Sequence, residues 1–311
     1  MSQPSPEPRS LPGVASPIAA AILAGALVWL VWWALVSNRS GQALDALALE
    51  GSKIGAWRLD AQADQLLGSV SIPLVAGMIM LVLIIGALRG RWVAAAAAAI
   101  AIAGANVTTQ VVKNQLLTRA DLLGMGSWSA ENTLPSGHTT VAAAGLVGLI
   151  LVVPPVLRSL TTLVSVAGVG AFGFATLVSQ WHRPSDVVAA VLVAVGWGYL
   201  AVAVMRIADK VGRVRDEAHR PGAMSVILVM LAICGLALSA AGGFLSWNVD
   251  PDRADRTTAF IAYVAGVAAV GGVTCGGLGA LLRMVDASRP IPRSREKENA
   301  AQPAAASAQS A

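Results

Sequence analysis

The chain has 311 residues, of which 56% are hydrophobic and 13% are charged, and its mean hydropathy is +0.67. Soluble domains contain about 25% charged residues, so the composition excludes an ordinary soluble domain and indicates an integral membrane protein. We attribute the net charge of +5 to basic residues that face the inner leaflet, and we expect no nucleic-acid partner.

Eight segments are long and apolar enough to be membrane spans, which need about 20 mostly apolar residues. An open sheet would leave its edge groups unpaired in lipid, and the short alternating segments of a membrane barrel are absent. The sequence therefore predicts an all-α, polytopic membrane protein. In chain order, its spans are expected at 16–36, 70–88, 92–112, 138–157, 160–180, 185–205, 223–246 and 258–282.

The distribution of lysine and arginine predicts the orientation of these spans. With the N-terminus inside, the connecting segments place 14 of these cations on the inner side and 8 on the outer side, and cytoplasmic loops carry the excess. Tryptophans near the outer helix ends resemble an aromatic belt; they are Trp29, Trp32, Trp33, Trp181 and Trp247. We therefore expect a plasma-membrane protein with both chain ends in the cytoplasm.

Three polar clusters interrupt the apolar pattern. They are residues 106–124, the stretch from Glu131 into the fourth span, and residues 176–193. In the expected orientation all three reach the outer face at the same membrane level. Ionisable groups near a membrane core are costly, so this convergence predicts a functional site on the extracytoplasmic side.

The first two clusters offer groups that suit an anion. Lys113 and Arg119 are cations, and arginine presents a planar fork to phosphate. Ser136 and Gly137 lie where the fourth span begins, and a helix N-terminus offers unpaired N–H groups to an anion. The glycine lets the backbone approach a ligand closely, and His138 can supply or accept a proton.

The third cluster contains His182 and Asp186, which are four residues apart and share one face of a helical turn. A carboxylate beside an imidazole fixes its tautomer and stabilises its charged form, and such a histidine can act as a nucleophile. Simpler interpretations exist, because Ser136 can be only a helix cap, Asp186 a charge at a helix start, and Lys113 an end anchor. Their joint occurrence favours a site.

These motifs resemble those of the type 2 phosphatidic acid phosphatase (PAP2) superfamily of membrane lipid phosphatases. Pro-Ser-Gly-His at 135–138 matches completely, and His-Arg-Pro-Ser-Asp at 182–186 matches the end of the third family motif. The resemblance implies a six-helix catalytic core at 16–206. The remaining expected units are a cytoplasmic tail at 1–15, a basic loop with two further spans at 207–283, and a disordered tail at 284–311.

The resemblance also implies a mechanism that uses no metal and no cofactor. His182 would attack phosphorus and form a phosphohistidine, while Asp186 would orient it. His138 would protonate the leaving lipid oxygen and then activate water. The phosphoryl oxygens would be held by Lys113, Arg119, Ser136 and the N–H of Gly137. The implied substrate is a lipid phosphate, such as an isoprenoid carrier phosphate or a phosphatidate.

Two departures from the family pattern affect the phosphate-binding residues. Five residues separate Lys113 from Arg119 where the family has six, and Ala120 replaces the proline that follows. The arginine of the third motif is replaced by Thr176, which offers one hydrogen bond to a phosphate but no charge. Arg183, next to His182, is a candidate to compensate for the missing cation.

Two classes of function follow from these motifs. The first is a lipid phosphate or diphosphate phosphatase, and the second is a non-hydrolytic protein that binds or transports lipid phosphates through a degenerate site. The two histidines and the aspartate favour the phosphatase, whereas the missing arginine favours the binder. On position alone, segments 37–69 and 120–132 are candidates for a lid or a head-group selector.

Overall fold

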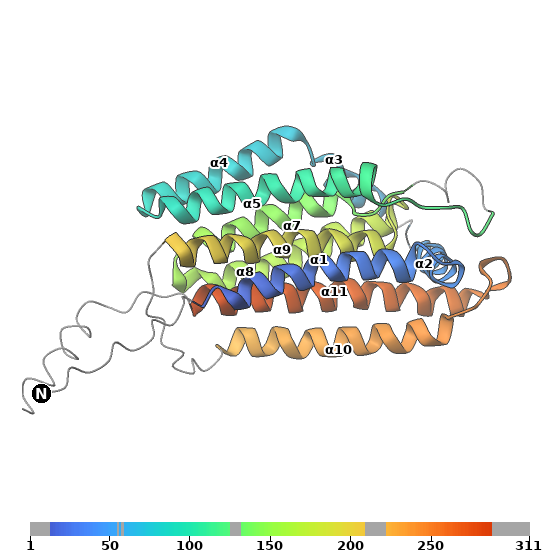
Figure 1. Cartoon of the computed structure of the whole chain (residues 1–311). Helices are drawn as coiled ribbons and strands as arrows, with labels where there is room; N and C mark the ends of the chain where they lie inside the picture. The colour runs from blue at the N-terminus through green and yellow to red at the C-terminus, as the bar shows by residue number, and fades with distance from the viewer. Residues whose placement is uncertain (1–12, 55, 57–58, 125–131, 209–221, 288–311) are drawn as a thin grey trace, which may run out of the picture.

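The structure, a computed structural model, describes residues 13–54, 56, 59–124, 132–208 and 222–287. Within these ranges the chain forms helices joined by turns and loops, with no β-strand, which confirms the all-α prediction. The long helices run roughly parallel to one another in a single bundle (Figure 1).

Each of the eight expected spans contains a helix, so the six helices of the expected core and the two further ones are present. They are α1 (Ala15–Leu35), α4 (Ile72–Leu88), α5 (Trp92–Val111), α7 (Gly137–Val152), α8 (Pro155–Val178), α9 (Pro184–Ala208), α10 (Ala223–Ser246) and α11 (Arg256–Asp286). The polytopic helical architecture is therefore confirmed.

The helices differ in how completely they can cross a bilayer. Among the described residues, six are long and apolar enough to do so alone, namely α1, α8, α9, α10, α11, and α5 with its π-helical extension Val112–Leu116. The helix α3 (Asp60–Gly68) and α4 pass the same test together, with a bend of 64° between them. α7 has 16 residues, about 24 Å, and is largely enclosed by other helices. The number of full crossings stays a prediction.

The junction between the fourth and fifth spans differs from the expected one. The fourth span was expected to run to residue 157, but α7 ends at Val152 and α8 begins at Pro155. The pair Pro154 and Pro155 explains the difference, because proline breaks a helix interior but fits the first helical turn. Arg89 donates a hydrogen bond to the carbonyl of Val152, which satisfies one of the groups left open at the end of α7.

The segment 37–69 forms helices α2 (Arg39–Ser52) and α3 where we considered a lid or selector loop. The side chain of Asn38 accepts a hydrogen bond of 2.8 Å from the backbone N–H of Gly41, which caps the start of α2. α2 runs across the end of the bundle beside α1 and α11, and Figure 1 shows it nearly end-on. Nine of its 14 residues are buried, so α2 is an integral part of the fold.

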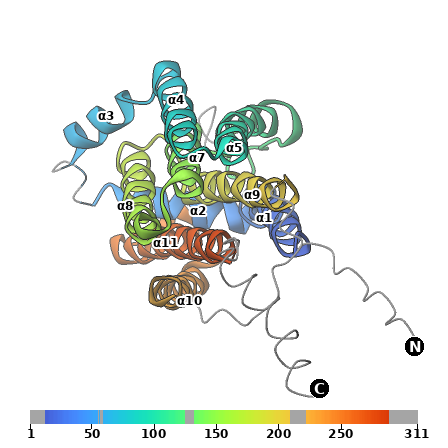
Figure 2. The same ribbon diagram turned by 90° about the vertical axis from the view of Figure 1, so that its left-hand side faces the viewer.

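Helix α9 is the centre of the bundle. It packs against α1, α5, α7 and α11 (Figure 2), and most of its residues are buried. Close packing with α5 relies on small residues, since a Cβ added at Gly104 would lie 2.6 Å from the Trp197 ring of α9. The first turn of α9, which carries Asp186, is thereby anchored in the core.

Gly51→Ala is expected to destabilise the protein, because α2 and α11 touch at this residue. A Cβ at Gly51 would lie 2.0 Å from the carbonyl oxygen of Ala259, and only a shift of the two helices relieves that clash. Overpacking of this kind costs about 1–3 kcal/mol, so the Tm of the detergent-purified protein should fall by several degrees. Gly68→Ala is the control, since a Cβ there meets no atom within 4 Å; equal Tm values for the two variants would contradict the described packing.

Candidate functional site

The three polar clusters meet at the end of the bundle that carries α2. The first and second are joined by Asn132, whose side-chain amide donates to the carbonyls of Lys113 (2.9 Å) and Leu117 (2.8 Å). The second and third are joined by the backbone, because the N–H of Ser136 donates to the carbonyl of Asp186 at 3.0 Å. The convergence expected from the sequence is therefore present in the fold.

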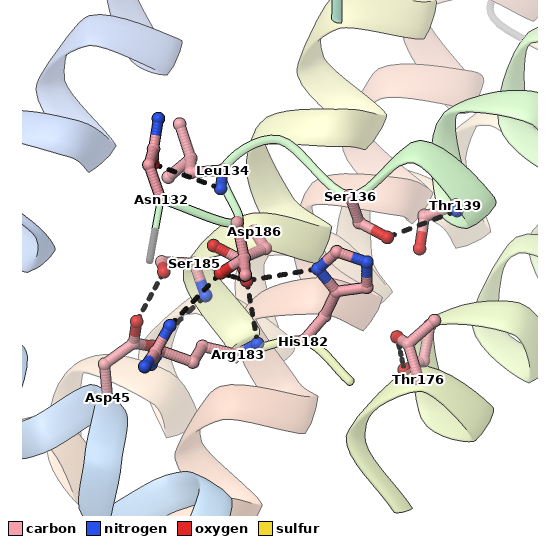
Figure 3. Close-up of polar contacts among 12 residues, drawn as sticks. Asp45, Asn132, Leu134, Ser136, Thr139, Thr176, His182, Arg183, Ser185 and Asp186 are labelled. Carbon is pink, nitrogen blue, oxygen red and sulfur yellow. Dashed lines mark hydrogen bonds and ion pairs between the residues drawn. The ribbon is translucent and has the colours of Figure 1, made fainter. Parts of the chain in front are cut away.

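His182 and Asp186 form a buried pair at the start of α9 (Figure 3). Nδ1 of His182 lies 3.3 Å from Oδ2 of Asp186, and the two side chains are 7% and 1% exposed. The backbone N–H of His182 donates to the carbonyl of Thr176, which fixes the position of the histidine on the turn before the helix. Because Asp186 holds Nδ1, Nε2 is the nitrogen of His182 that can act on a ligand.

Oδ2 of Asp186 collects hydrogen bonds from two further groups. The hydroxyl of Thr133 donates to it at 2.6 Å, and the backbone N–H of Arg183 donates at 3.0 Å. Among the described residues Oδ1 is buried without a hydrogen-bond partner. The carboxylate is therefore held mainly through one oxygen, which it shares with His182.

The side chain of Arg183 turns away from His182. Its Nη1 donates to the hydroxyl of Thr133 at 3.1 Å, and the residue is 1% exposed. Figure 3 shows the guanidinium and the His182 ring on either side of Asp186. The Arg183 guanidinium is thus linked to the Asp186 carboxylate through Thr133, and it lies on the side of the site that faces Asp45.

His138 lies on the first turn of α7 and faces His182. The ring centroids of the two histidines are 6.2 Å apart, and the His138 ring meets Trp181 edge-on at 5.1 Å. His182 and Lys113 both lie close enough to His138 to interact with it electrostatically. The space between the two imidazoles is the one place where both could act on the same group.

Ser136 and Gly137 start α7 as the sequence indicated. The hydroxyl of Ser136 is buried and accepts a hydrogen bond of 3.4 Å from the backbone N–H of Thr139, so Ser136 is the N-cap of the helix. A Cβ added at Gly137 would have Gln110 Nε2 as its nearest neighbour, at 3.9 Å. Packing within the chain therefore does not require glycine at this position.

Thr176 uses its polar groups to build the turn that precedes α9. Its buried hydroxyl donates to the carbonyl of Gly173 at 2.8 Å. Its own carbonyl accepts hydrogen bonds from the N–H groups of Trp181 and His182. Thr176 thereby positions His182 through the backbone.

The two cations of the first cluster differ in burial. Lys113 is half-buried on the π-helical turn after α5. Arg119 is 8% exposed despite its shifted spacing. Burial and the charge of Arg183 lower the pKa of Arg119, while Asp45 and Asp186 act in the opposite direction. Arg119 consequently belongs to the same buried charge cluster as Arg183.

Two residues of this cluster were missed by the sequence analysis. Thr133 carried no signal beyond its place beside the Pro-Ser-Gly-His motif. Asp45 lies on α2, 3% exposed, and its carboxylate accepts hydrogen bonds from Ser185. Its only signal was an acidic residue in the apolar stretch Ala-Leu-Asp-Ala-Leu-Ala-Leu. Burial and then the charge of Asp186 raise the pKa of Asp45 to about 6, against the opposing effects of Arg119, Ser185 and Arg183.

The fold and the site define an α-helical, polytopic membrane protein with a buried His–Asp pair, a second histidine and nearby cations. Residues 94–210 match the model of the PAP2 superfamily, so the resemblance noted in the sequence is confirmed and the chain carries a PAP2 segment there. Members of this superfamily are generally phosphatases. No curated protein and no solved structure gives a significant match to the chain.

The matched segment contains every residue that the sequence analysis assigned to the site. It begins inside α5 and covers Lys113, Arg119, both histidines and Asp186, which is narrower than the expected core at 16–206. Helices α1, α2, α4, α10 and α11 lie outside it. Asp45, on α2, therefore joins the charge cluster of the site from outside the segment that matches the family.

Thr133→Val is expected to destabilise the protein, because the hydroxyl links Arg183 to Asp186. The variant keeps the shape of the side chain but leaves both buried partners with one hydrogen bond fewer, a loss of about 1–3 kcal/mol. Thermal unfolding in detergent measures the effect, with the exposed Thr257→Val as control. A Tm of Thr133→Val equal to that of Thr257→Val would argue against this link.

Proposed function

We propose that the protein is a metal-independent phosphatase of lipid phosphates or diphosphates that acts at the extracytoplasmic face. The observation that carries the proposal is the buried His182–Asp186 pair with His138 facing it, 6.2 Å away between ring centroids. The PAP2 match over the same residues supports a phosphatase of lipid phosphates at the level of the family.

The first half of the reaction transfers the phosphoryl group to His182. Nε2 of His182 attacks phosphorus, the bond between phosphorus and the lipid oxygen breaks, and His138 donates a proton to that oxygen. A phosphohistidine and the dephosphorylated lipid result, or a lipid monophosphate if the substrate is a diphosphate. Asp186 stabilises the positive charge that develops on the His182 ring.

The second half returns the site to its starting state. His138, now neutral, takes a proton from a water molecule whose oxygen attacks phosphorus. The bond between phosphorus and Nε2 of His182 breaks, and inorganic phosphate leaves. In each half the attacking and leaving atoms are in line on opposite sides of phosphorus, so the nucleophile and the acid have to lie one phosphoryl group apart. The distance of 6.2 Å between the ring centroids of His182 and His138 is consistent with one phosphoryl group between them.

The phosphoryl oxygens need positive groups, because phosphoryl transfer depends mostly on positioning and charge stabilisation. We assign this role to Lys113, Arg119 and the start of α7, where Ser136 and the N–H of Gly137 lie. Arg183 and Thr176 were expected to bind phosphate as well. Their contacts with Thr133 and Gly173 favour a role in holding Asp186 and His182 in place.

The alternative function is non-hydrolytic binding or transport of a lipid phosphate. The observation in its favour is Thr176, which stands where the family has an arginine and whose hydroxyl is already bonded to the backbone. A binder, however, needs cations more than it needs a nucleophile oriented by a carboxylate. The His182–Asp186 contact therefore favours hydrolysis.

Detergent-purified protein is expected to release inorganic phosphate from phosphatidate or a polyprenyl phosphate in the presence of a chelator. His182→Ala should abolish release because the nucleophile is lost, and His138→Ala should slow it by about 10²–10⁴-fold, the usual contribution of a general acid–base. His219→Ala, which removes the remaining histidine, is the matched control and should keep full activity. Strict dependence on added Mg²⁺, or no release from any lipid phosphate by folded protein, would rule the phosphatase out.

The proposed orientation places the site outside the cytoplasm. Arg206, at the end of α9, donates to the carbonyl of Gly13 before α1 and to that of Met284 near the end of α11. The beginning of α1 and the end of α11 thus lie together, at the opposite end of the bundle from α2 and the site (Figure 1). Together with the excess of cations expected on the inner side, this supports cytoplasmic chain ends. Ser127, a residue suited to labelling by its sequence position, lies outside the described residues.

Cysteines on the two connecting sides test this orientation. In a background where Cys234 and Cys275 are replaced by alanine, Asp252→Cys in the α10–α11 connection should react with an impermeant thiol reagent added to intact cells. Gly222→Cys, which precedes α10 at the other end of that helix, should react only after the membrane is opened. Both positions are exposed, so the opposite labelling pattern would invert the proposed topology.

A further inference from the structure

One buried face of α2 contacts the segments that carry the proposed catalytic and phosphate-binding residues. Gln42, Asp45 and Ser52 lie on this face at helical spacing, and all three are buried. Since α2 lies outside the PAP2 segment, these contacts are additional to the family motifs.

Gln42 holds the backbone just after Arg119. Its side-chain N–H donates to the carbonyl of Ala120 at 2.7 Å, and its side-chain oxygen accepts from the N–H of Leu122 at 3.3 Å. The loop segment that carries Arg119 is thereby hydrogen-bonded to α2 on both sides of Asp121.

Ser52 holds the turn before His182 at the other end of the same face. Its hydroxyl shares its proton between the carbonyl of Leu49 on α2 (2.7 Å) and that of Leu177 (2.9 Å), and it accepts a hydrogen bond from the side-chain amide of Gln180. This turn also contains the Thr176 carbonyl that binds the His182 N–H, so α2 contributes to the position of the histidine.

Asp45 lies between these two anchors and touches the start of α9. Its Oδ1 accepts from the backbone N–H of Ser185 at 3.3 Å, and its Oδ2 accepts from the Ser185 hydroxyl. Ser185 directly precedes Asp186. Arg119 and Arg183 both attract the Asp45 carboxylate, whereas Asp186 repels it.

A buried carboxylate at this position is costly for stability. Burial raises the pKa of Asp45 to about 6, above the ordinary value of about 3.9. A raised pKa means that the protonated carboxyl stabilises the folded state at acid pH and that this stabilisation is lost as the pH rises through about 6. Ionised Asp45 therefore strains the fold at neutral pH, where an amide of the same shape would not.

We propose that Asp45 is a positioning residue whose negative charge orients Arg119 and Arg183 and fixes the start of α9, so that His182 and the phosphate-binding cations face one ligand. The inference rests on the proposed phosphatase function. It adds to that site a carboxylate supplied by α2, which acts through the arginines and Ser185 and does not touch the phosphoryl group itself.

The charged groups that interact with the Asp45 carboxylate come from two segments, and the 3₁₀ turn Pro251–Arg253 that also packs on α2 has exposed charged residues. Arg119 comes from the segment after α5, and Arg183 and Asp186 come from the start of α9. α1 carries no titratable residue, and Tyr263 of α11 packs beside Gly51 as a phenol that ordinarily ionises near pH 10. Arg39, Glu50 and Lys53 of α2 itself are exposed.

Asp45→Asn tests the charge while it retains the shape of the side chain. Its one amide oxygen can accept from the Ser185 N–H, and its amide N–H can donate to the Ser185 hydroxyl, which accepted no such bond from the carboxylate. Glu50→Gln is the matched control, because it makes the same chemical change at an exposed residue of the same helix. Phosphate release from phosphatidate in detergent micelles is measured for wild type and both variants from pH 5 to pH 8, together with Tm. The affinity for orthovanadate, an anion of phosphate-like shape, is measured by calorimetry as a readout that does not require turnover.

Asp45→Asn should lower kcat/KM at pH 8 by roughly tenfold, the effect of about 1.4 kcal/mol, and weaken orthovanadate binding by a similar factor. The ratio of wild-type to variant activity should approach one at pH 5, because the Asp45 carboxyl of the wild type is then mostly protonated and as uncharged as the amide of the variant. Taking the ratio at each pH also cancels the titration of the histidines, which both proteins share. The Tm at pH 8 should be unchanged or higher than that of wild type, and Glu50→Gln should match wild type in every measurement.

Three outcomes would overturn the inference. An Asp45→Asn variant that equals Glu50→Gln in activity and vanadate affinity would show that the charge positions nothing. A variant with a lowered Tm and an activity ratio that does not change with pH would reduce Asp45 to a structural residue. If the wild-type protein neither releases phosphate nor binds orthovanadate, the inference ends because the proposed function itself has failed. If it binds orthovanadate without releasing phosphate, the non-hydrolytic binding function remains, and the vanadate affinities of the variants still test the role of Asp45.

Discussion

The carboxylate of Asp186 is the constraint on which the site depends. The Oδ2 atom is shared by His182, Thr133 and the N–H of Arg183. The backbone carbonyl of Asp186 also accepts a hydrogen bond from the N–H of Ser136. Through these contacts one residue at the start of a largely buried helix joins the second and third polar clusters. Because α9 is the centre of the bundle, the carboxylate has little freedom to move. An imidazole held by such a group is oriented before any ligand arrives, which is the requirement for a histidine that acts as a nucleophile.

The charge around this carboxylate is balanced by residues that arrive from distant parts of the chain. Arg119, Arg183 and Asp45 are all buried, and Asp45 interacts electrostatically with both arginines while it accepts hydrogen bonds from Ser185. A buried charge is tolerated only when opposite charges and hydrogen bonds surround it. The cluster therefore explains how an arginine at 183 can be enclosed beside the histidine. Thr176 stands where the family has an arginine, and its hydroxyl is bonded to the backbone. The two buried arginines of the cluster supply cations near the site in spite of this replacement.

Local signals in the sequence were sufficient for much of this arrangement. Apolar length predicted all eight long helices, and the four-residue spacing predicted the contact between His182 and Asp186. The Pro154–Pro155 break was missed because hydropathy alone carried the fourth span to residue 157. α2 was missed because its apolar stripe is short and interrupted by polar residues. Asp45 was missed with it, since its hydrogen-bond partner Ser185 lies 140 residues away. The direction of the Arg183 side chain also depends on a distant partner, Thr133, and no local pattern predicts it.

The proposed phosphatase function depends most directly on covalent chemistry at Nε2 of His182. Purified protein is mixed with radiolabelled phosphatidate, quenched with base within the first turnovers, and digested for mass spectrometry, because phosphohistidine survives base and is lost in acid. We expect a base-stable, acid-labile phosphate on the peptide that contains His182, and none in the His182→Ala variant. The phosphohistidine mechanism would be contradicted if the wild-type protein released phosphate without a label at His182. It would also be contradicted if the His182→Ala variant carried as much label as the wild type.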